Sequence, residues 1–79
     1  SDLWRLVFEP MDSVTKKLIQ RAVTEDITKW ERRVQVTSVK VVSDDNVVSL
    51  SVEYRISPST TVEELTVQFS QNNYQTATE

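Results

Sequence analysis

The sequence contains no glycine, no cysteine and no histidine among its 79 residues. Without cysteine, disulfides, thiolate metal sites and thiol nucleophiles are excluded. Without histidine, the chain lacks a common zinc ligand and the side chain that most often acts as a general base near neutral pH. Phosphate-binding loops, dinucleotide fingerprints and nucleophile elbows all need backbone positions that glycine occupies at least cost. These absences remove most classes of enzyme, and we expect no catalytic centre, no metal site and no cofactor.

Charge and hydropathy exclude further classes of partner. The net charge is −3, from nine basic and twelve acidic residues mixed along the chain, so no concentrated positive field would attract phosphates. No apolar run approaches the roughly 20 residues that span a bilayer, and the N-terminus lacks the layout of a secretory signal. We therefore expect protein partners, with no nucleic acid, no membrane and no small-molecule substrate. We also expect the chain to be made in the cytoplasm, or in a particle assembled there.

Two helices are predicted in the first part of the chain. Residues 2–8 predict a short helix, buried nearly all round, that Pro10 brings to an end. Asp12 or Ser13 is a suitable N-cap for a long amphipathic helix over residues 12–29. Its predicted core face follows the 3.6-residue period and comprises Val14, Leu18, Ile19, Ala22, Val23, Ile27 and Trp30. The opposite face is expected to be solvated and carries Lys16, Lys17, Gln20, Arg21, Thr24 and Glu25.

Strands are predicted from Val34 onward, where the apolar period changes to two. The alternation slips by one step near Thr37 and Ser38, which predicts a bulge or a strong twist in the first strand. The polar run at residues 43–46 is typical of a hairpin turn. Residues 48–56 alternate most cleanly and predict a second strand with one core face and one polar face. A third strand is predicted beyond a loop that contains Pro58, in which the alternating apolar residues are Leu65, Val67 and Phe69.

This order of elements predicts an α+β fold in one domain that spans residues 1–79. Because each strand is apolar on one face only, we expect a three-stranded antiparallel meander covered on one side by the long helix. Residues 71–79 are polar and are expected to fray.

A three-stranded sheet has two edges, and an edge strand offers unpaired backbone groups to another chain. The third strand has neither lysine nor proline between Val62 and Ser70. Its edge is therefore a candidate pairing site for a foreign strand, formed by Leu65, Thr66, Val67, Gln68 and Phe69. An alternative stays open, in which the C-terminal tail folds back over this edge.

The junction after the long helix resembles a known family. Trp30, Glu31, Arg32, Arg33 and Val34 are similar to the aromatic residue, Glu-Pro-Arg and Ile or Val at this point in the GPW/tail-lysozyme-like family of contractile-tail baseplate proteins. The resemblance extends from about Leu3 to Ser70, with a leucine-rich segment that ends in Phe8, Glu9 and Pro10 and a second strand that contains Val52, Glu53, Tyr54, Arg55 and Ile56.

Two features depart from the family pattern. Arg32 stands where the family has proline, so the junction lacks the fixed φ that proline supplies. Members also begin with further residues, including a Phe-Gly pair just before the position of Ser1. We therefore expect that this chain lacks the N-terminal segment of its parent, which would also explain the absence of glycine.

The resemblance implies a structural, non-enzymatic role. Family members sit in the baseplates of contractile phage tails and related injection machines, including the type VI secretion baseplate. The implied partners are the wedge core proteins of the baseplate and the subunits of the tail sheath. Family members offer strands that resemble the linking strands of the sheath, so the first sheath ring assembles on them. The implied location is the tail baseplate of a virion or a contractile machine in the bacterial cytoplasm.

The candidate protein-binding residues are Trp30, Glu31, Arg32 and Arg33. In extended backbone, Glu31 and Arg33 project to the same side, so they can hold each other while the guanidinium reaches a partner. Alternatively, the basic residues after the helix only complement its dipole. Trp30 is expected mainly in the core, with a place at the rim of an interface as the alternative.

Two other functions are alternatives to the baseplate role. Glycosidase activity is one alternative, because some relatives are labelled lysozymes. A retaining glycosidase needs two carboxylates about 5 Å apart, one of them desolvated. The candidate carboxylates lie among basic residues or on polar faces, where a raised pKa is not expected, and they are Glu9, Glu25, Glu31 and Glu53. A small cytosolic regulator that binds one protein would share every physical feature of the baseplate reading.

Overall fold

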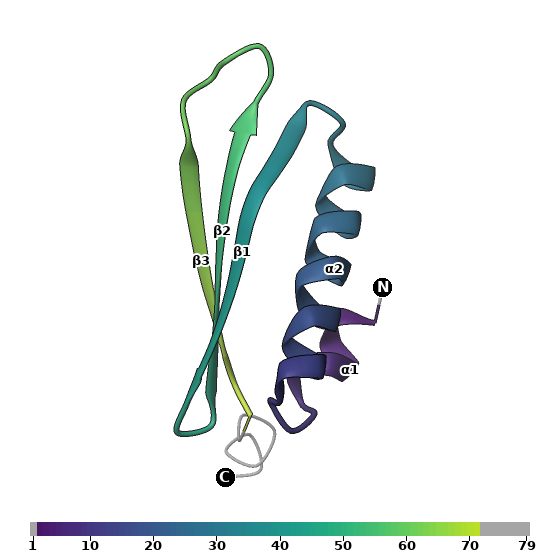
Figure 1. The fold of residues 1–79 in the computed structure, drawn as a ribbon, viewed down its shortest axis with the longest axis vertical. Coiled ribbons are helices and arrows are strands. Elements are labelled where there is room, and N and C mark those ends of the chain that lie inside the picture. Colours follow the sequence, from purple (N-terminus) through teal and green to yellow (C-terminus); the bar gives the residue numbers. More distant parts are fainter. Residues whose placement is uncertain (1, 72–79) are drawn as a thin grey trace, which may run out of the picture.

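Two helices and three strands follow one another in the computed structural model, which describes residues 2–71 (Figure 1). The helices are α1 (Leu3–Val7) and α2 (Ser13–Trp30), and the strands are β1 (Val34–Asp44), β2 (Val47–Ile56) and β3 (Glu63–Ser70). Adjacent strands are antiparallel, and their order in the sheet is β1-β2-β3. The predicted α+β class and the meander are therefore confirmed. Residues 72–79 of the predicted tail lie outside the described residues.

The start of α2 is fixed by Asp12. Its carboxylate accepts a hydrogen bond from the backbone N–H of Thr15 at 2.8 Å, as an N-cap residue does. The same bond holds the pKa of Asp12 below its usual value. Along α2, Ile19 and Val23 are buried against the sheet, whereas Val14 and Leu18 are exposed. The apolar residues of α2 are thus not confined to its buried face.

The short helix α1 is not buried all round, contrary to expectation. Leu6 and Val7 enter the core, but Trp4 and Phe8 remain exposed. A helix of five residues has only about one turn to place against its neighbours, so the side chains on its outer side have nothing to cover them. The ring of Trp4 meets Phe69 of β3 edge to face, with centroids 5.2 Å apart.

The β1–β2 hairpin has the predicted bulge and a tight turn. The register shifts by one residue between Val36 and Ser38, which leaves Thr37 without a partner residue on β2. The turn places Asp45 and Asn46 at φ of 54° and 68°. Positive φ at both central positions is the requirement of a type I′ hairpin turn, and Asn and Asp adopt it more readily than other non-glycine residues. The chain therefore makes a tight hairpin without glycine.

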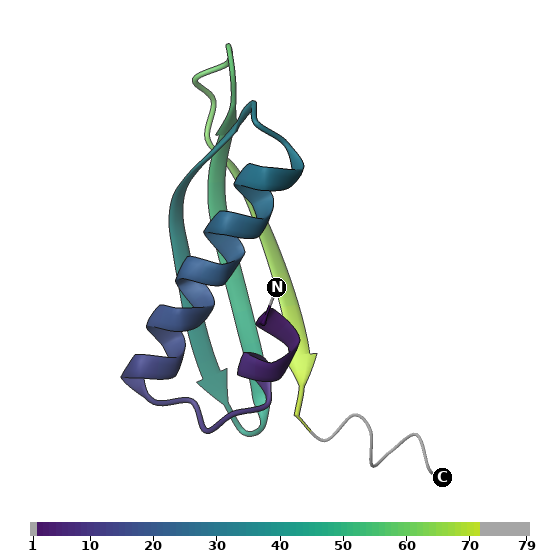
Figure 2. The same ribbon diagram turned by 90° about the vertical axis from the view of Figure 1, so that its right-hand side faces the viewer.

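The core lies between the two helices and the first two strands. It comprises Leu6, Val7, Ile19, Val23, Val41, Val48, Leu50 and Val52. Figure 2 shows α2 lying across β1 and β2, while α1 lies over the end of β3. Neither of the two described helices lies over the remaining inner face of β3, and Leu65 is 50% and Val67 38% exposed.

The expectation that the long helix covers all three strands is therefore wrong for β3. A helix with its side chains is about 10 Å wide, and neighbouring strands are about 4.8 Å apart, so one helix covers about two strands.

Candidate docking surfaces

The helix-to-strand junction is built around Glu31 and Arg33. Glu31 is the C-cap residue of α2 and has extended backbone. Arg33 grips its carboxylate with two parallel hydrogen bonds, from Nε to Oε1 at 3.1 Å and from Nη2 to Oε2 at 3.2 Å. The backbone N–H of Arg33 also donates to Oε1 at 3.1 Å. The predicted contact between these two residues is present, and it closes the turn between α2 and β1.

The electrostatics of this pair keep both groups charged. The hydrogen bonds from Arg33 lower the pKa of Glu31, and the carboxylate in turn raises the pKa of Arg33. The side chain of Arg33 is 67% exposed and that of Glu31 is 32% exposed. Because Nε and Nη2 bind Glu31, the edge of the guanidinium formed by Nη1 and Nη2 points away from the pair. That edge has the geometry to bind a second carboxylate or a carbonyl.

Trp30 is not a core residue. It is 85% exposed, so the prediction that it packs the helix end against the sheet is wrong. Figure 1 shows that the twisted sheet places β2 and β3 farther than β1 from the end of α2. Arg32 is exposed as well, beside Thr28 and Lys29 on the outer side of the same helix end.

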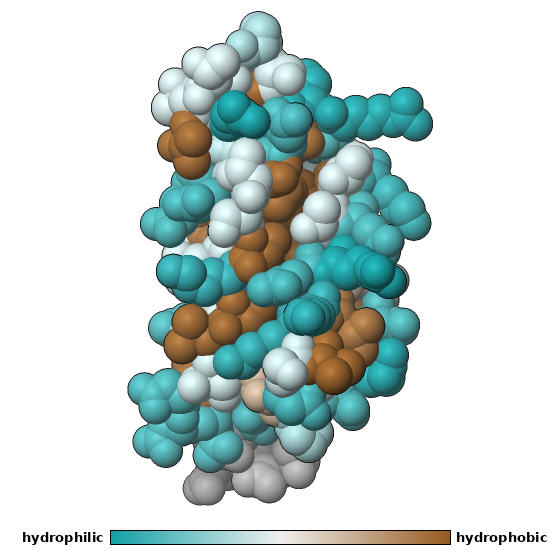
Figure 3. All heavy atoms as spheres, in the orientation of Figure 1, coloured by the Kyte–Doolittle hydropathy of each residue, from teal (hydrophilic) through white to brown (hydrophobic). Residues whose placement is uncertain are grey.

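An apolar groove opens below Trp30. Its volume is about 330 Å³, and Glu31 and Arg33 stand at its rim. Its other lining residues come from the end of α2 and from all three strands, and they are Ile27, Trp30, Val34, Val52, Tyr54, Ile56 and Leu65. Figure 3 shows hydrophobic surface along the boundary between the sheet and α2. The sequence pattern assigned most of these residues to the core, so the groove was not anticipated.

The edge of β3 is regular. Its register with β2 runs from Glu63 to Ser70 without a shift, and the N–H of Gln71 extends the pairing by donating to the carbonyl of Asn46 at 2.7 Å. In an antiparallel ladder, alternate residues bond to the neighbouring strand and the residues between them direct their backbone groups away. Counting back from Gln71, the outward N–H and C=O groups belong to Glu64, Thr66, Gln68 and Ser70. Within residues 2–71, no hydrogen bond joins these groups to another segment.

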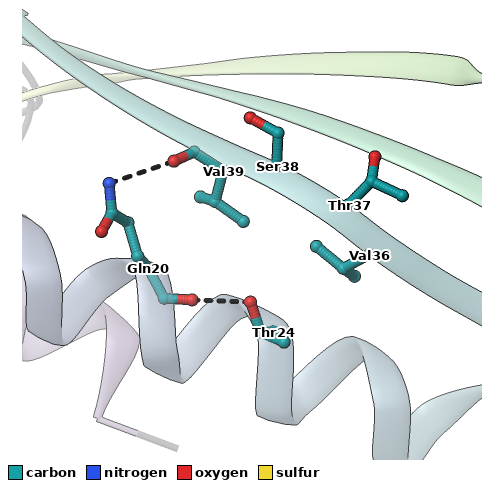
Figure 4. Close-up of a pocket in the computed structure, with 6 residues that line it drawn as sticks. All are labelled: Gln20, Thr24, Val36, Thr37, Ser38 and Val39. Atoms are coloured by element: carbon teal, nitrogen blue, oxygen red, sulfur yellow. Dashed lines mark hydrogen bonds between the residues drawn. The ribbon is translucent and has the colours of Figure 1, made fainter.

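The edge of β1 is obstructed. The bulge at Thr37 interrupts the strand, and the side-chain amide of Gln20 donates to the outward carbonyl of Val39 at 3.1 Å. Thr24 lies one turn along α2 and donates to the carbonyl of Gln20 at 2.8 Å (Figure 4). The cleft between α2 and β1 that these residues line is small and polar. Gln20 and Thr24 were predicted to be merely solvated, and that prediction is wrong because they face the strand edge.

Metal-binding clusters and membrane-spanning helices are absent from the described part of the chain. Across residues 2–71, His, Cys, Asp and Glu side chains form no group of three that could hold a metal ion. The two described helices do not reach the combination of length and hydropathy that membrane-spanning helices need. Glu31, one of the carboxylates considered for a glycosidase, has a lowered pKa, whereas a general acid requires a raised one.

Comparison with known proteins places the chain in a family. A family model described as baseplate wedge protein gp25 matches residues 1–61. The chain belongs to this family. A protein from Geobacter sulfurreducens, described as a tail lysozyme, has a similar crystal structure with a TM-score of 0.75 and 25% identity. The similarity covers 87% of this chain and 65% of that one, so this chain spans slightly less than two thirds of its length. No match was found among curated proteins.

The family assignment confirms the resemblance seen in the sequence. It identifies the chain as a member of a family of baseplate wedge proteins. The matched region contains the junction at Glu31 and Arg33 and ends before β3 begins at Glu63. The structural similarity, in contrast, covers more of the chain than the family model does.

Proposed function

We propose that this domain docks on neighbouring wedge proteins through its helix-to-strand junction and starts sheath assembly by accepting a strand at β3. The observation that carries the proposal is the difference between the two edges of the sheet. The outward backbone groups of β3 lie on a regular strand, whereas β1 is bulged and its Val39 carbonyl is bonded by Gln20. An added strand gains main-chain hydrogen bonds wherever an edge is regular and accessible. Seeding a strand-linked polymer needs one such edge.

The junction supplies the proposed contact to the wedge core proteins. Arg33 is held by Glu31 in one orientation, so little side-chain freedom is lost when the outer edge of its guanidinium binds a partner. Trp30, which is exposed beside it, adds a large apolar surface of the kind that dominates interface energies. Arg32 contributes charge at the same corner of the molecule. In this proposal one docking surface, called the docking corner, is formed by the four residues predicted from the sequence, Trp30, Glu31, Arg32 and Arg33.

Substitution of Arg33 tests this corner. Arg33→Ala should change the free energy of unfolding by no more than about 0.5 kcal/mol, because the side chain is exposed. Binding to a wedge partner should weaken by roughly 2 to 5 kcal/mol, as expected for loss of a desolvated charged contact. Arg32→Ala is the matched control and should have a milder effect. A large loss of stability with unchanged binding would make the pair an internal brace instead of a docking site.

The proposal includes no enzymatic activity, although the similar protein is described as a tail lysozyme. Retaining glycosidases hold one carboxyl group in an apolar site that raises its pKa. We expect no hydrolysis of peptidoglycan by the purified chain in a turbidity assay of a cell-wall suspension. Clearing that is lost in Glu9→Gln or Glu31→Gln would show that the domain is a lysozyme.

Proline substitutions in β3 test the seeding role. Thr66 and Gln68 both direct their N–H groups to the open side, so Thr66→Pro and Gln68→Pro each remove one outward donor. Thr66→Ala is the control, because it removes the hydroxyl and keeps the N–H. We expect all three variants of the parent protein to fold, as judged by circular dichroism, and only the alanine variant to start sheaths seen by electron microscopy. Normal sheaths from two folded proline variants would rule out β3 as the seed.

A further inference from the structure

The polar face of the sheet beside the open edge has one unfavourable pair. Three polar residues of β3 lie opposite polar residues of β2 on this face. Gln68 donates to Ser49 at 3.2 Å, and Thr66 and Ser51 share a hydrogen bond at 3.4 Å. The third pair joins two carboxylates, Glu53 and Glu64. Like charges directly opposite each other destabilise a sheet, so this pair is a local defect next to the edge.

Within residues 2–71, no Lys or Arg side chain forms an ion pair with Glu53 or Glu64. Lys40 lines the same small surface cleft as Glu53 and Glu64, but it forms an ion pair with neither carboxylate. Lys40 lies on β1, whereas Glu64 lies on β3 with the open edge at its other side. Among the described strands, none lies on the open side of Glu64, so the position laterally adjacent to it is available to an added strand.

On the opposite face of β3, apolar side chains of an added strand would be favoured. Leu65 and Val67 point to the inner side of the sheet, where their partners across β2 are the buried Val52 and Leu50. Both β3 residues remain half-exposed. Side chains of an added strand alternate between the two faces, so every second residue of that strand would lie beside this apolar row. The residues between them would lie in the rows of Glu64, Thr66 and Gln68.

We propose that the segment that pairs with β3 alternates apolar and polar residues and carries Lys or Arg at the polar position beside Glu64. This inference rests on the proposed strand addition and specifies its chemistry. A slip by one residue would turn the apolar residues to the polar face, and a slip by two would move the cation from Glu64 to Thr66. The charge pair therefore sets the register of the incoming strand. The geometry applies to parallel and antiparallel addition, because neighbours in a row share a face in both.

Two synthetic peptides test the charge preference on the intact chain. Both are labelled, eight-residue peptides that alternate valine and threonine, and one central threonine is replaced by lysine in the first and by glutamate in the second. We expect the lysine peptide to bind at least about threefold more tightly in fluorescence anisotropy, from one attraction gained and one repulsion avoided. Glu64→Lys should reverse the preference. Glu63→Lys is the matched control, since it makes the same charge change on the inner face and should leave the preference in place.

The Thr66→Pro variant separates this inference from the proposed function. If both peptides lose affinity in this variant but neither is preferred by the unmodified chain, strand addition holds and the charge rule is wrong. If binding is unaffected by Thr66→Pro, the peptides bind elsewhere and both proposals fail. Absence of binding by either peptide would also overturn the inference. So would self-association of the chain through β3, measured by sedimentation, because the edge would then prefer a second copy.

Discussion

The two edge strands of this sheet differ in how accessible they are to another strand. β1 has a bulge, a helix beside it and a side-chain amide bonded to its Val39 carbonyl. β3 has an unbroken register, and within residues 2–71 neither helix covers the inner side chains Leu65 and Val67. Proteins that must stay monomeric obstruct both edges. Obstruction of one edge alone allows growth of the sheet in one direction, which is what a starting point for a polymer requires.

The largest expected effect separates the central strand from the open edge. Ser51→Pro in β2 removes a ladder hydrogen bond on the side of β1 and should lower the free energy of unfolding by about 3 kcal/mol or more, enough to unfold a domain of this size. Thr66→Pro in β3 should lower it by no more than roughly 1 kcal/mol, because no ladder bond is lost at an edge. Urea denaturation followed by circular dichroism measures both. Equal losses would show that β3 is not a free edge.

A pair of isosteric substitutions compares the inner faces of the two edge strands. Val41 of β1 is buried, so Val41→Thr places a hydroxyl in the core and should lower the free energy of unfolding by about 1 to 3 kcal/mol. Val67 of β3 is 38% exposed, so Val67→Thr should change it by less than about 0.5 kcal/mol. Thermal melting of the two variants provides the comparison. A large effect at Val67 would mean that its apolar face is already covered within the domain.

Removing the bulge and the Gln20 bond from the edge of β1 should lower the free energy of unfolding less than the substitutions above in β2 and in the core. It should also allow the chain to self-associate through this edge. Deletion of Thr37 removes the bulge and keeps Val36 and Val39 on one face, because they already lie opposite Tyr54 and Val52 and would then be two positions apart in the sequence. Gln20→Ala frees the carbonyl of Val39, and loss of that bond should lower the free energy of unfolding by about 1 kcal/mol. We expect the doubly altered chain to self-associate in analytical ultracentrifugation. A strictly monomeric variant would mean that the bulge and Gln20 are not what protects this edge.

The smallest expected effect is the pH response of the junction. The folded-state pKa of Glu31 is lowered by Arg33, so the pair stabilises the junction above the ordinary glutamate pKa. This stabilisation is lost as the pH falls through the lowered pKa, and the loss should be small because the pair is exposed to solvent. Glu31→Gln should remove that acid transition from the chemical shift of the Arg33 amide, titrated by NMR. An unchanged titration would show that another group controls it.

Local patterns in the sequence predicted most of the fold. The position of Asp12 set the start of α2, and the slip in alternation near Thr37 revealed the bulge, because each depends on a few neighbouring residues. The spacing of Glu31 and Arg33 likewise predicted that they could hold each other. These features are decided by backbone geometry over two to four residues, so a single sequence contains the information.

Burial at the margin of the sheet was not predictable in the same way. Trp30 and Leu65 have the periodicity of core residues, yet both line an open groove. Their exposure depends on how many strands one helix covers and on how the sheet twists away from it, which no local pattern records. The role of Gln20 was missed for a related reason, because its contact with Val39 spans 19 positions in the sequence.

Hydrogen exchange at both edges of the sheet, measured on one sample, tests most directly whether the sheath begins on β3. The outward amides of β3 belong to Glu64, Thr66, Gln68 and Ser70, and those of β1 include Val41 and Ser43. Exchange at these sites is compared between the free chain and the chain assembled with sheath subunits. We predict that assembly slows exchange at the four β3 amides and leaves the two β1 amides unchanged. Slowing at β1 with no change at β3 would contradict the assignment of β3 as the edge on which the sheath begins.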